Sequence, residues 1–255
     1  MTRRGFLAAV PVAAAACAAP AVSGSPAPAE SPTATSVAAT PSATPSPTSS
    51  AGPAAGGPAR ELVHATSGRP EVALTFHGAG DLDLARKILT GFASRGAAVT
   101  VLAVGTWLQE YPGAAQLVTG NGHELGNHTW SHPTLSALSE SGIRTEIERC
   151  RDRLAALTGS PGAFFRPSAA QHATPTVLRL AGAAGYSTVL SYDVDSRDFT
   201  DPGAPAIERV VGAAAAGSVV SMHLGHPGTL AALPVLLDEL AKRGLRPVTA
   251  SALFR

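Results

Sequence analysis

From residue 61 onward, short apolar runs alternate with segments of helical periodicity. Five runs have the length and the β-branched content of buried strands, at 71–76, 98–104, 186–194, 218–224 and 246–250. Two weaker strand candidates lie at 123–128 and 163–166. Between the strands, apolar residues recur with the period of an amphipathic helix at 81–96, 139–159, 174–186 and 228–244.

This alternation is typical of parallel βα units. About seven strands in roughly 190 residues favour an α/β fold of the distorted, incomplete (β/α) barrel type. An open doubly wound sheet is the alternative. In both architectures ligands bind beyond the carboxyl ends of the strands, so polar residues at those ends are the candidates for a functional site.

The first 17 residues have the pattern of an export signal. Arg3 and Arg4 precede a short apolar run, and the pair followed by Phe6 resembles a twin-arginine signal. The run is shorter than the roughly 20 residues that a transmembrane helix needs. Cys17 follows a run of alanines, as in a bacterial lipoprotein box, which predicts lipidation at Cys17. Cleavage nearby, with Cys17 discarded, is the alternative, and both predict a protein that works outside the cytoplasm.

Residues 18–60 are almost all Ala, Pro, Ser, Thr and Gly, without periodicity, and they predict a disordered tether. Residues 61–255 form the predicted catalytic domain. The formal net charge of +1 gives no electrostatic footprint for nucleic acid, so we expect no nucleic-acid partner. Cys150 lies in a helical pattern and is interpreted as a plain helix residue.

Polar residues gather at five predicted strand ends. Because parallel strands end at one edge of a sheet or barrel, these side chains are expected to converge. They are His77 and Asp81 after the first strand, His128 and His132 after residues 123–126, Arg166 after residues 163–165, Asp193, Asp195 and Asp198 after residues 187–192, and His223 directly after residues 219–222.

His128 and His132 are spaced i, i+4. On a helical turn this spacing places both imidazoles on one face, where they can bind one metal ion. Two solvated polar residues in a loop are the alternative.

Several segments together resemble the polysaccharide deacetylase family, carbohydrate esterase family 4. The resemblance covers about residues 70–255, and its most specific part is the run GHELGNHTWSH; the segments are 71–76, 122–139, 164–168, 193–199 and 219–223. It implies a distorted (β/α) barrel that removes N- or O-acetyl groups from sugars such as peptidoglycan or chitin. It also implies a divalent metal ion, often zinc.

The resemblance implies roles for individual residues. His128 and His132 match the two metal histidines, and His223 matches the histidine that acts as general acid. Arg166, which precedes Pro167, matches the arginine that orients the catalytic base.

Asp195 or Asp198 matches the aspartate motif of the late strand, and both registers remain open. Trp107 and Trp130 are the aromatic residues best placed to stack on a sugar, with a core position as the alternative for Trp107. Pro167 is assigned to substrate binding together with Trp130.

The chain departs from the family where two adjacent aspartates, a base and a third metal ligand, normally follow the first strand. His77 and Gly78 stand there instead. Asp81 could supply the carboxylate ligand while His77 serves as base. His77 could itself be the third ligand, in a three-histidine site. The site could also have lost activity and only bind glycan. Asp81 equally suits the N-cap of the helix that follows it.

The sequence therefore predicts an exported hydrolase that depends on a divalent metal ion, with Zn²⁺ expected. Its expected substrate is an acetylated cell-wall or extracellular polysaccharide, and its only expected membrane contact is a lipid at Cys17. A catalytically inactive glycan-binding module on the same fold is the alternative.

Overall fold

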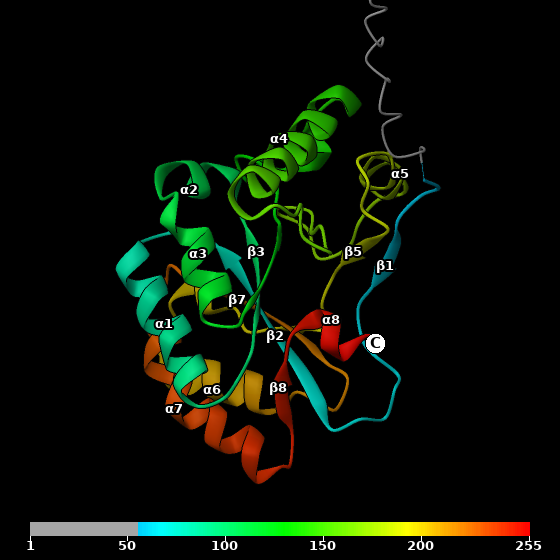
Figure 1. The fold of residues 1–255 in the computed structure, drawn as a ribbon. Coiled ribbons are helices and arrows are strands. Elements are labelled where there is room, and N and C mark those ends of the chain that lie inside the picture. Colours follow the sequence, from blue (N-terminus) through cyan, green and yellow to red (C-terminus); the bar gives the residue numbers. More distant parts are fainter. Residues whose placement is uncertain (1–55) are drawn as a thin grey trace, which may run out of the picture. The chain divides into compact units, whose positions relative to one another are not determined.

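The computed structural model describes residues 56–255 (Figure 1). The predicted export signal, the lipidation at Cys17 and the tether up to residue 55 lie outside the described residues. Among the residues that are described, no helix combines the length and apolar character needed to cross a bilayer.

A parallel sheet built around β2 (Glu71–Gly78) forms the centre of the fold. Its strands run in the order β4-β3-β2-β7-β6, and β8 pairs with the first half of β2. Seven of the eight residues of β2 are buried, which are Glu71–Phe76 and Gly78, as expected for a strand covered on both faces. The other strands are β3 (Thr100–Ala103), β4 (Glu124–Asn127), β6 (Val194–Asp195), β7 (Val219–His223) and β8 (Arg246–Val248).

A second, two-stranded sheet closes the other side. It pairs β1 (Arg60–Leu62) with β5 (Thr188–Leu190), also in parallel. Phe165 forms isolated bridges to Asn127 and to Val189, so it joins the edge of β4 to β5 without a continuous ladder. The result is the distorted (β/α) barrel that the sequence predicts, with the strand ends of both sheets at one rim.

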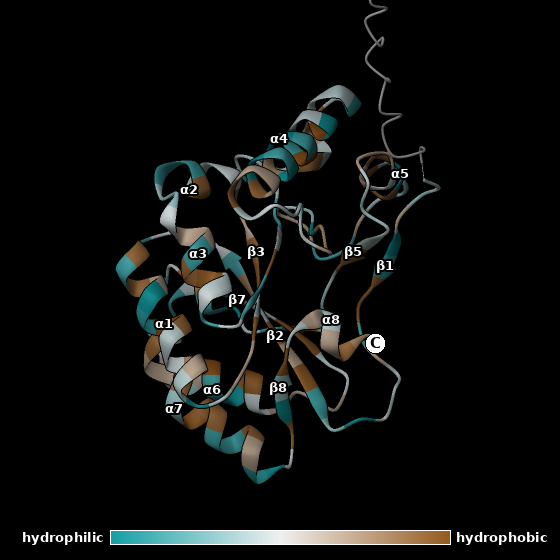
Figure 2. Cartoon of the chain, in the orientation of Figure 1, coloured by the Kyte–Doolittle hydropathy of each residue, from teal (hydrophilic) through white to brown (hydrophobic). Residues whose placement is uncertain are grey.

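Helices cover the outside of the main sheet (Figure 1). Figure 2 shows apolar residues in the central strands and mixed apolar and polar positions along α1, α4 and α7. In α1, Ala85, Ile88, Leu89 and Phe92 form the buried face. The helices are α1 (Leu82–Ser94), α2 (Gly105–Glu110), α3 (Gly113–Gly120), α4 (Glu140–Thr158), α5 (Pro175–Ala183), α6 (Ala204–Gly212), α7 (Pro227–Lys242) and α8 (Ala250–Leu253), with single 3-10 turns η1 (Leu135–Ala137) and η2 (Asp198–Thr200).

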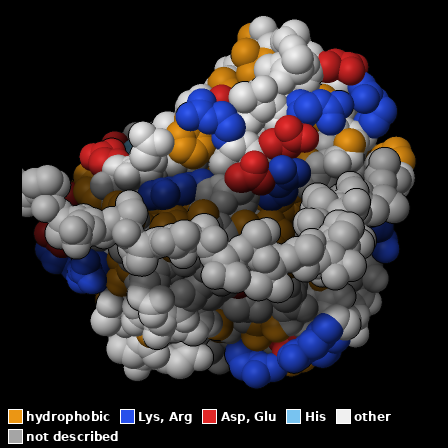
Figure 3. Space-filling view, turned by 45° about the horizontal axis from the view of Figure 1, so that its top comes forward, with side chains coloured by type: hydrophobic (Ala, Val, Ile, Leu, Met, Phe, Trp, Pro, Cys, Tyr) orange, Lys and Arg blue, Asp and Glu red, His pale blue; other side chains and the backbone are white. Residues whose placement is uncertain are grey.

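The surface of α4 carries charges of both signs. Figure 3 shows basic and acidic side chains next to one another on this side of the molecule. Arg144 pairs with Glu148, and Arg151 pairs with Asp152. On the buried side of α4, the Cys150 thiol donates to the carbonyl of Ala103, and burial raises its pKa to about 12. Cys150 is thus a residue of helix α4, as predicted, and its side chain lies in the core.

The predicted elements differ from the observed ones in a few places. The 186–194 run splits into two short strands, and the 163–166 run forms only the bridges at Phe165. The sequence analysis missed β1 and the helices α2, α3, α6 and α8. Ala59 and Arg60, assigned to the tether, belong to the fold: Ala59 is buried, and Arg60 begins β1.

Candidate metal centre

His77 and His223 lie side by side at the ends of neighbouring parallel strands. They are register partners between β2 and β7, and their ring centroids are 4.4 Å apart. Because side chains alternate along a strand, His77 shares its face with Thr75, while Phe76 points into the main core. The strand register therefore places both imidazoles over the same end of the barrel.

His128 directly follows β4, and the backbone fixes its ring orientation. Its amide donates to the carbonyl of Ala103, and its Nδ1 lies 3.0 Å from the carbonyl oxygen of Arg166. A carbonyl can only accept, so Nδ1 carries the proton and Nε2 carries the lone pair. Nε2 is buried without a hydrogen-bond partner, as expected for a ring nitrogen that ligates a metal.

A tight loop, not a helical turn, brings His132 back toward His128. Thr129 and His132 have left-handed backbones, with φ of 66° and 58°. Asn127 holds the loop by accepting from the amide of Thr129, and Glu146 accepts from the amide and hydroxyl of Ser131. The prediction that the two histidines converge is correct, but the helical turn assumed for it is wrong.

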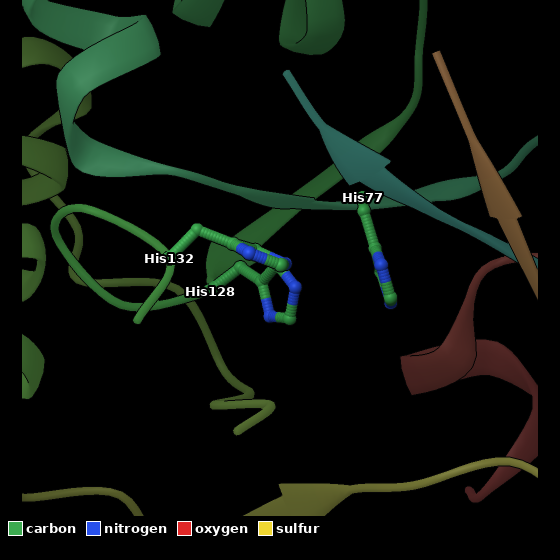
Figure 4. Close-up of side chains that lie close together, drawn as sticks. All are labelled: His77, His128 and His132. Carbon is green, nitrogen blue, oxygen red and sulfur yellow. The ribbon is translucent and has the colours of Figure 1, made fainter. Parts of the chain in front are cut away.

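His77, His128 and His132 form one cluster (Figure 4). One ring nitrogen from each lies within 4.8 Å of the other two. Burial, followed by the charges of neighbouring groups, lowers the pKa of His77 and His128 well below 6.5, and burial also lowers that of His132. The three rings are therefore neutral at pH 7, with lone pairs available.

Buried ring nitrogens without hydrogen-bond partners also indicate a metal ion at this cluster. Both ring nitrogens of His77 are buried without a hydrogen-bond partner, as is Nε2 of His128. Buried polar atoms are rarely unpaired in native proteins, and an ion is one recognised reason. Three neutral imidazoles are a ligand set that Zn²⁺ accepts, with an open fourth position.

Asp81 is not part of this cluster. Its carboxylate caps α1 by accepting from the amide of Leu84 at 2.8 Å. The loop before it is packed in place, because the Trp107 indole donates to the carbonyl of Gly80, and a Cβ on Gly80 would lie 2.6 Å from the Cα of Gly225. The expectation that Asp81 supplies a metal ligand is therefore wrong. Its carboxylate caps α1 and is not part of the histidine cluster.

Gly78 lies on the opposite face of β2 from His77. A Cβ there would lie 2.8 Å from a methyl of Val101 and 3.0 Å from the Cα of Ala103. The position has no room for a side chain, because β2 packs closely against β3 there. An aspartate, which the family has at this position, would not fit.

The structure distinguishes the two late aspartates. Asp198 is fully buried and pairs with His223, whose Nδ1 lies 2.6 Å from its Oδ1. The other oxygen accepts from the backbone amide of His223 and from the hydroxyl of Thr229. Although burial opposes it, these hydrogen bonds and the charge of His223 lower the pKa of Asp198. Asp195 does not join the pair, and its carboxylate lies in the wall of a cavity.

Arg166 is fully buried beneath the centre. Its Nε donates to the carbonyl of Leu190 and its Nη2 to the hydroxyl of Thr75, at 2.7 and 2.8 Å. Burial lowers its pKa to about 9. The expected contact with a catalytic base is not formed, because the arginine's hydrogen-bond partners are neutral oxygens.

A cavity of about 500 Å³ opens over the histidines. Its lining includes neither Trp130 nor Pro167, so the substrate contacts predicted for them are not supported. The Trp130 ring packs beside Gly105 and under the Arg149 guanidinium, 4.0 Å from the ring centroid. The residues that line the cavity are His77, Ala79, His132, Ala169, Ala170, Gln171, Tyr192, Asp195, Phe199, Ser221 and His223.

The sequence analysis missed two aromatic residues of this lining. Phe199 is 44% exposed and lies 5.2 Å from the His223 ring, between centroids. Tyr192 lies in the same wall. An aromatic residue directly after Asp198 was the available signal for Phe199.

Comparison with known proteins finds polysaccharide deacetylases. A family model for polysaccharide deacetylases matches residues 64–189. A peptidoglycan-N-acetylglucosamine deacetylase of Bacillus cereus is 33% identical over 189 residues, covering 72% of this chain and 88% of the relative.

Solved structures show the same fold. A crystal structure of a peptidoglycan N-acetylglucosamine deacetylase matches with a TM-score of 0.71 at 28% identity, over 76% of this chain and 92% of that one. A pseudoenzyme of carbohydrate esterase family 4 from Bacillus anthracis shares the fold with a TM-score of 0.71 at 22% identity, over 76% of this chain and 68% of that one. With the sequence match to the relative and the family model, the chain belongs to the polysaccharide deacetylase family.

Proposed function

We propose that the protein is a metal-dependent hydrolase that removes acetyl groups from an N-acetylated cell-wall or extracellular polysaccharide. The observation that carries the proposal is that a cluster of three neutral imidazoles and a His–Asp pair lie at one cavity, which His77, His132 and His223 line. A Lewis-acid site and a proton donor are the two components that amide hydrolysis needs at neutral pH.

His77, His128 and His132 are the residues that would hold the metal ion. Zn²⁺ is the ion we propose, because imidazole ligands favour it over Mg²⁺ or Ca²⁺. When bound, it supplies Lewis-acid polarisation of the acetyl carbonyl and lowers the pKa of a bound water. His77 is thus assigned as the third ligand, and the alternative role as base is set aside.

His223 is proposed as the general acid. The Asp198 carboxylate accepts a hydrogen bond from Nδ1–H of His223 and holds the imidazole ring in place. Nε2 is therefore the nitrogen that can donate a proton to the leaving amine. Asp195 is the only carboxylate in the cavity lining among the described residues, and we assign it the role of accepting the proton from water. Arg166 holds the floor of the site through Thr75 instead of contacting that base.

Phe199 and Tyr192 are proposed as sugar contacts. Their rings lie in the cavity wall, and Phe199 presents its ring beside the proposed acid. Aromatic faces provide a large, rigid apolar surface.

The site of action is proposed to be outside the cytoplasm. The support is the sequence pattern of residues 1–17, with a lipid at Cys17 as the membrane contact. The cysteine prediction is tested by comparing the membrane fraction of the full chain with that of Cys17→Ala.

The function is tested by zinc content and acetate release. The full chain should bind one zinc ion and release acetate from N-acetylglucosamine oligomers or peptidoglycan, and a chelator should stop the release. His223→Ala should lower the rate by about 10²- to 10⁴-fold, as expected for a lost general acid, without loss of zinc. Acetate release that is unchanged after metal removal would contradict the proposal.

Glycan binding without catalysis is the second candidate. The observation that favours it is the absence of a carboxylate from the cluster of His77, His128 and His132. Under this hypothesis the protein retains zinc and binds oligosaccharide, but it releases no acetate at any metal concentration.

A further inference from the structure

Two His–Asp pairs of the same spacing lie next to one another beside the cavity. Nδ1 of His223 lies 2.6 Å from Oδ1 of Asp198, and the partners are 25 residues apart. Nδ1 of His226 lies 2.9 Å from Oδ1 of Asp201, again 25 residues away. The two imidazole rings meet edge to face, with 5.9 Å between their centroids. His223 lines the cavity and His226 does not, so the proposed reaction gives the second pair no role.

Phe199 lies on a single turn between the two aspartates. The turn is η2, and the residues on either side of it, Arg197 and Asp201, have left-handed backbones with φ of 56° and 50°. A left-handed backbone is uncommon for residues other than glycine, and it persists where surrounding contacts hold it. The turn that carries the Phe199 ring therefore depends on its contacts with other parts of the chain.

Contacts from the end of β7 and the start of α7 hold the turn at both ends. At its first residue, the carboxylate of Asp198 accepts from the amide and the ring of His223 and from the hydroxyl of Thr229. At its far end, the bond between Asp201 and His226 is the only hydrogen bond that joins residues 199–201 to a distant segment of the described chain. The second pair is thus the distant support of the half of the turn that bears Phe199.

The second pair also closes a ring of hydrogen bonds with the first. The Thr229 hydroxyl donates to Asp198, and the Thr229 amide donates to the carbonyl of His226. His226 donates from Nδ1 to the Asp201 carboxylate, since a carboxylate can only accept, and the Asp201 amide donates to the carbonyl of Asp198. Removal of the His226 ring opens this cycle at Asp201 and leaves the bonds between Asp198 and His223 in place.

We propose that His226 is a positioning residue for the glycan: through Asp201 it holds the η2 turn so that the Phe199 ring stays in the cavity wall. The ring is 44% exposed, and its aromatic and cationic neighbours are His223, 5.2 Å away between centroids, and the Arg197 guanidinium at 5.8 Å. Such an open ring binds a sugar more tightly when its backbone is held in place beforehand. The inference rests on the proposed function, in which Phe199 contacts the sugar.

The first test follows the Phe199 ring without any substrate. The full chain is labelled with 4-fluorophenylalanine, and the Phe199 signal is assigned among the seven phenylalanines with Phe199→Leu. His226→Ala should shift or broaden this fluorine signal and leave the others unchanged. His226→Asn should restore it, because the Asn amide can donate from nearly the position of Nδ1.

His64→Ala is the matched control for His226→Ala. His64 forms a similar surface pair, with 3.0 Å between its Nδ1 and Asp193, and its side chain is 39% exposed against 27% for His226. His64 does not line the cavity, so its removal should leave the Phe199 signal unchanged.

The second test asks whether His226 acts through Phe199. His226→Ala should raise KM for N-acetylglucosamine oligomers by about 2- to 5-fold, the size expected for one exposed pair, with kcat and its pH profile unchanged. In the Phe199→Ala background the same substitution should have no further effect, because two changes that act through one contact are not additive. If the protein binds glycan without releasing acetate, Kd from calorimetric titration takes the place of KM.

Two results would overturn the proposal. One is an unchanged Phe199 fluorine signal in His226→Ala. The other is an equal rise in KM or Kd on His226→Ala with and without the Phe199 ring. A native chain that neither releases acetate nor binds oligosaccharide would instead refute the proposed function and the glycan as the ligand of Phe199. The fluorine signal would still decide whether His226 holds the ring, so the two failures are distinguishable.

Discussion

Nδ1–H of His128 donates a hydrogen bond to the carbonyl oxygen of Arg166, with 3.0 Å between the nitrogen and the oxygen. This bond leaves Nε2 as the only acceptor of the ring and turns it toward His77 and His132. A metal-binding histidine is held in this way by an acceptor on its other nitrogen. The backbone carbonyl of Arg166, at one strand end, therefore orients the metal-binding ring of His128 at another.

His128→Ala should lower zinc affinity by at least roughly 100-fold, because it removes a ligand and not only its orientation. Competition with a chromophoric chelator measures the loss. His123→Ala is the control, since His123 bonds only to the backbone at Leu89 and Val99. Zinc affinity that is unchanged in His128→Ala would remove this residue from the centre.

Asp81→Ala should destabilise the fold by about 1 kcal/mol, because it removes the N-cap of α1. Urea unfolding measures the change. Asp81→Asn should remain close to the native chain, since Asn also caps helices. Both variants should keep their zinc, and loss of zinc from Asp81→Ala alone would restore Asp81 as a ligand.

Gly78→Asp should not rebuild a carboxylate ligand and should destabilise the fold. The Cβ collides with Val101 and Ala103, and overpacking of this kind costs about 1–3 kcal/mol before the buried charge is counted. Gly78→Ala separates the steric part from the charge. Urea unfolding and zinc stoichiometry are the measurements. A stable Gly78→Asp protein with tighter zinc binding would contradict the packing argument.

The metal-free protein should lose stability as the pH falls below 6.5. The pKa values of His77, His128 and His132 are lowered in the folded state, so between 6.5 and those lower values the unfolded state binds more protons. The melting temperature should therefore fall with pH in this window and remain flat above it. His128→Asn should reduce the slope. A flat profile in the chelated native protein would show that the rings are not buried as described.

Phe199→Ala should raise KM for acetylated oligosaccharides by about 3- to 10-fold with little change in kcat, because the ring contributes stacking area and no proton. Steady-state acetate release measures both constants. Val235→Ala is the matched control, since Val235 on α7 is exposed to the same degree, 45% against 44%. An equal effect of both substitutions would exclude a specific contact at Phe199.

Much of the fold and of the site was predictable because it depends on local pattern. The run 71–76 is mostly apolar and became most of β2, and the Ser139 and Gly159 that flank the α4 pattern became its caps. Convergence of the histidines follows from the parallel strands, because all of their carboxyl ends share one rim.

The parts that were not predictable depend on distant contacts. The turn between His128 and His132 has no sequence period, and its left-handed residues are held by Asn127 and Glu146. The pairing of Asp198 with His223 needs the register of two segments 25 residues apart. β1 is three residues long, too short for any pattern, and exists through its pairing with β5.

The contact of Gly80 with Gly225 has a consequence for how relatives of this chain can vary. Gly80 has a φ of 92°, and its missing side chain is what lets the segment after β2 touch the segment after β7. Any larger residue at position 80 would drive the two segments apart. In an alignment of relatives, a side chain at position 80 should therefore occur together with an insertion or a rerouted turn after β7. Sequence variation at one glycine would then report the spacing between the two histidine-bearing strands.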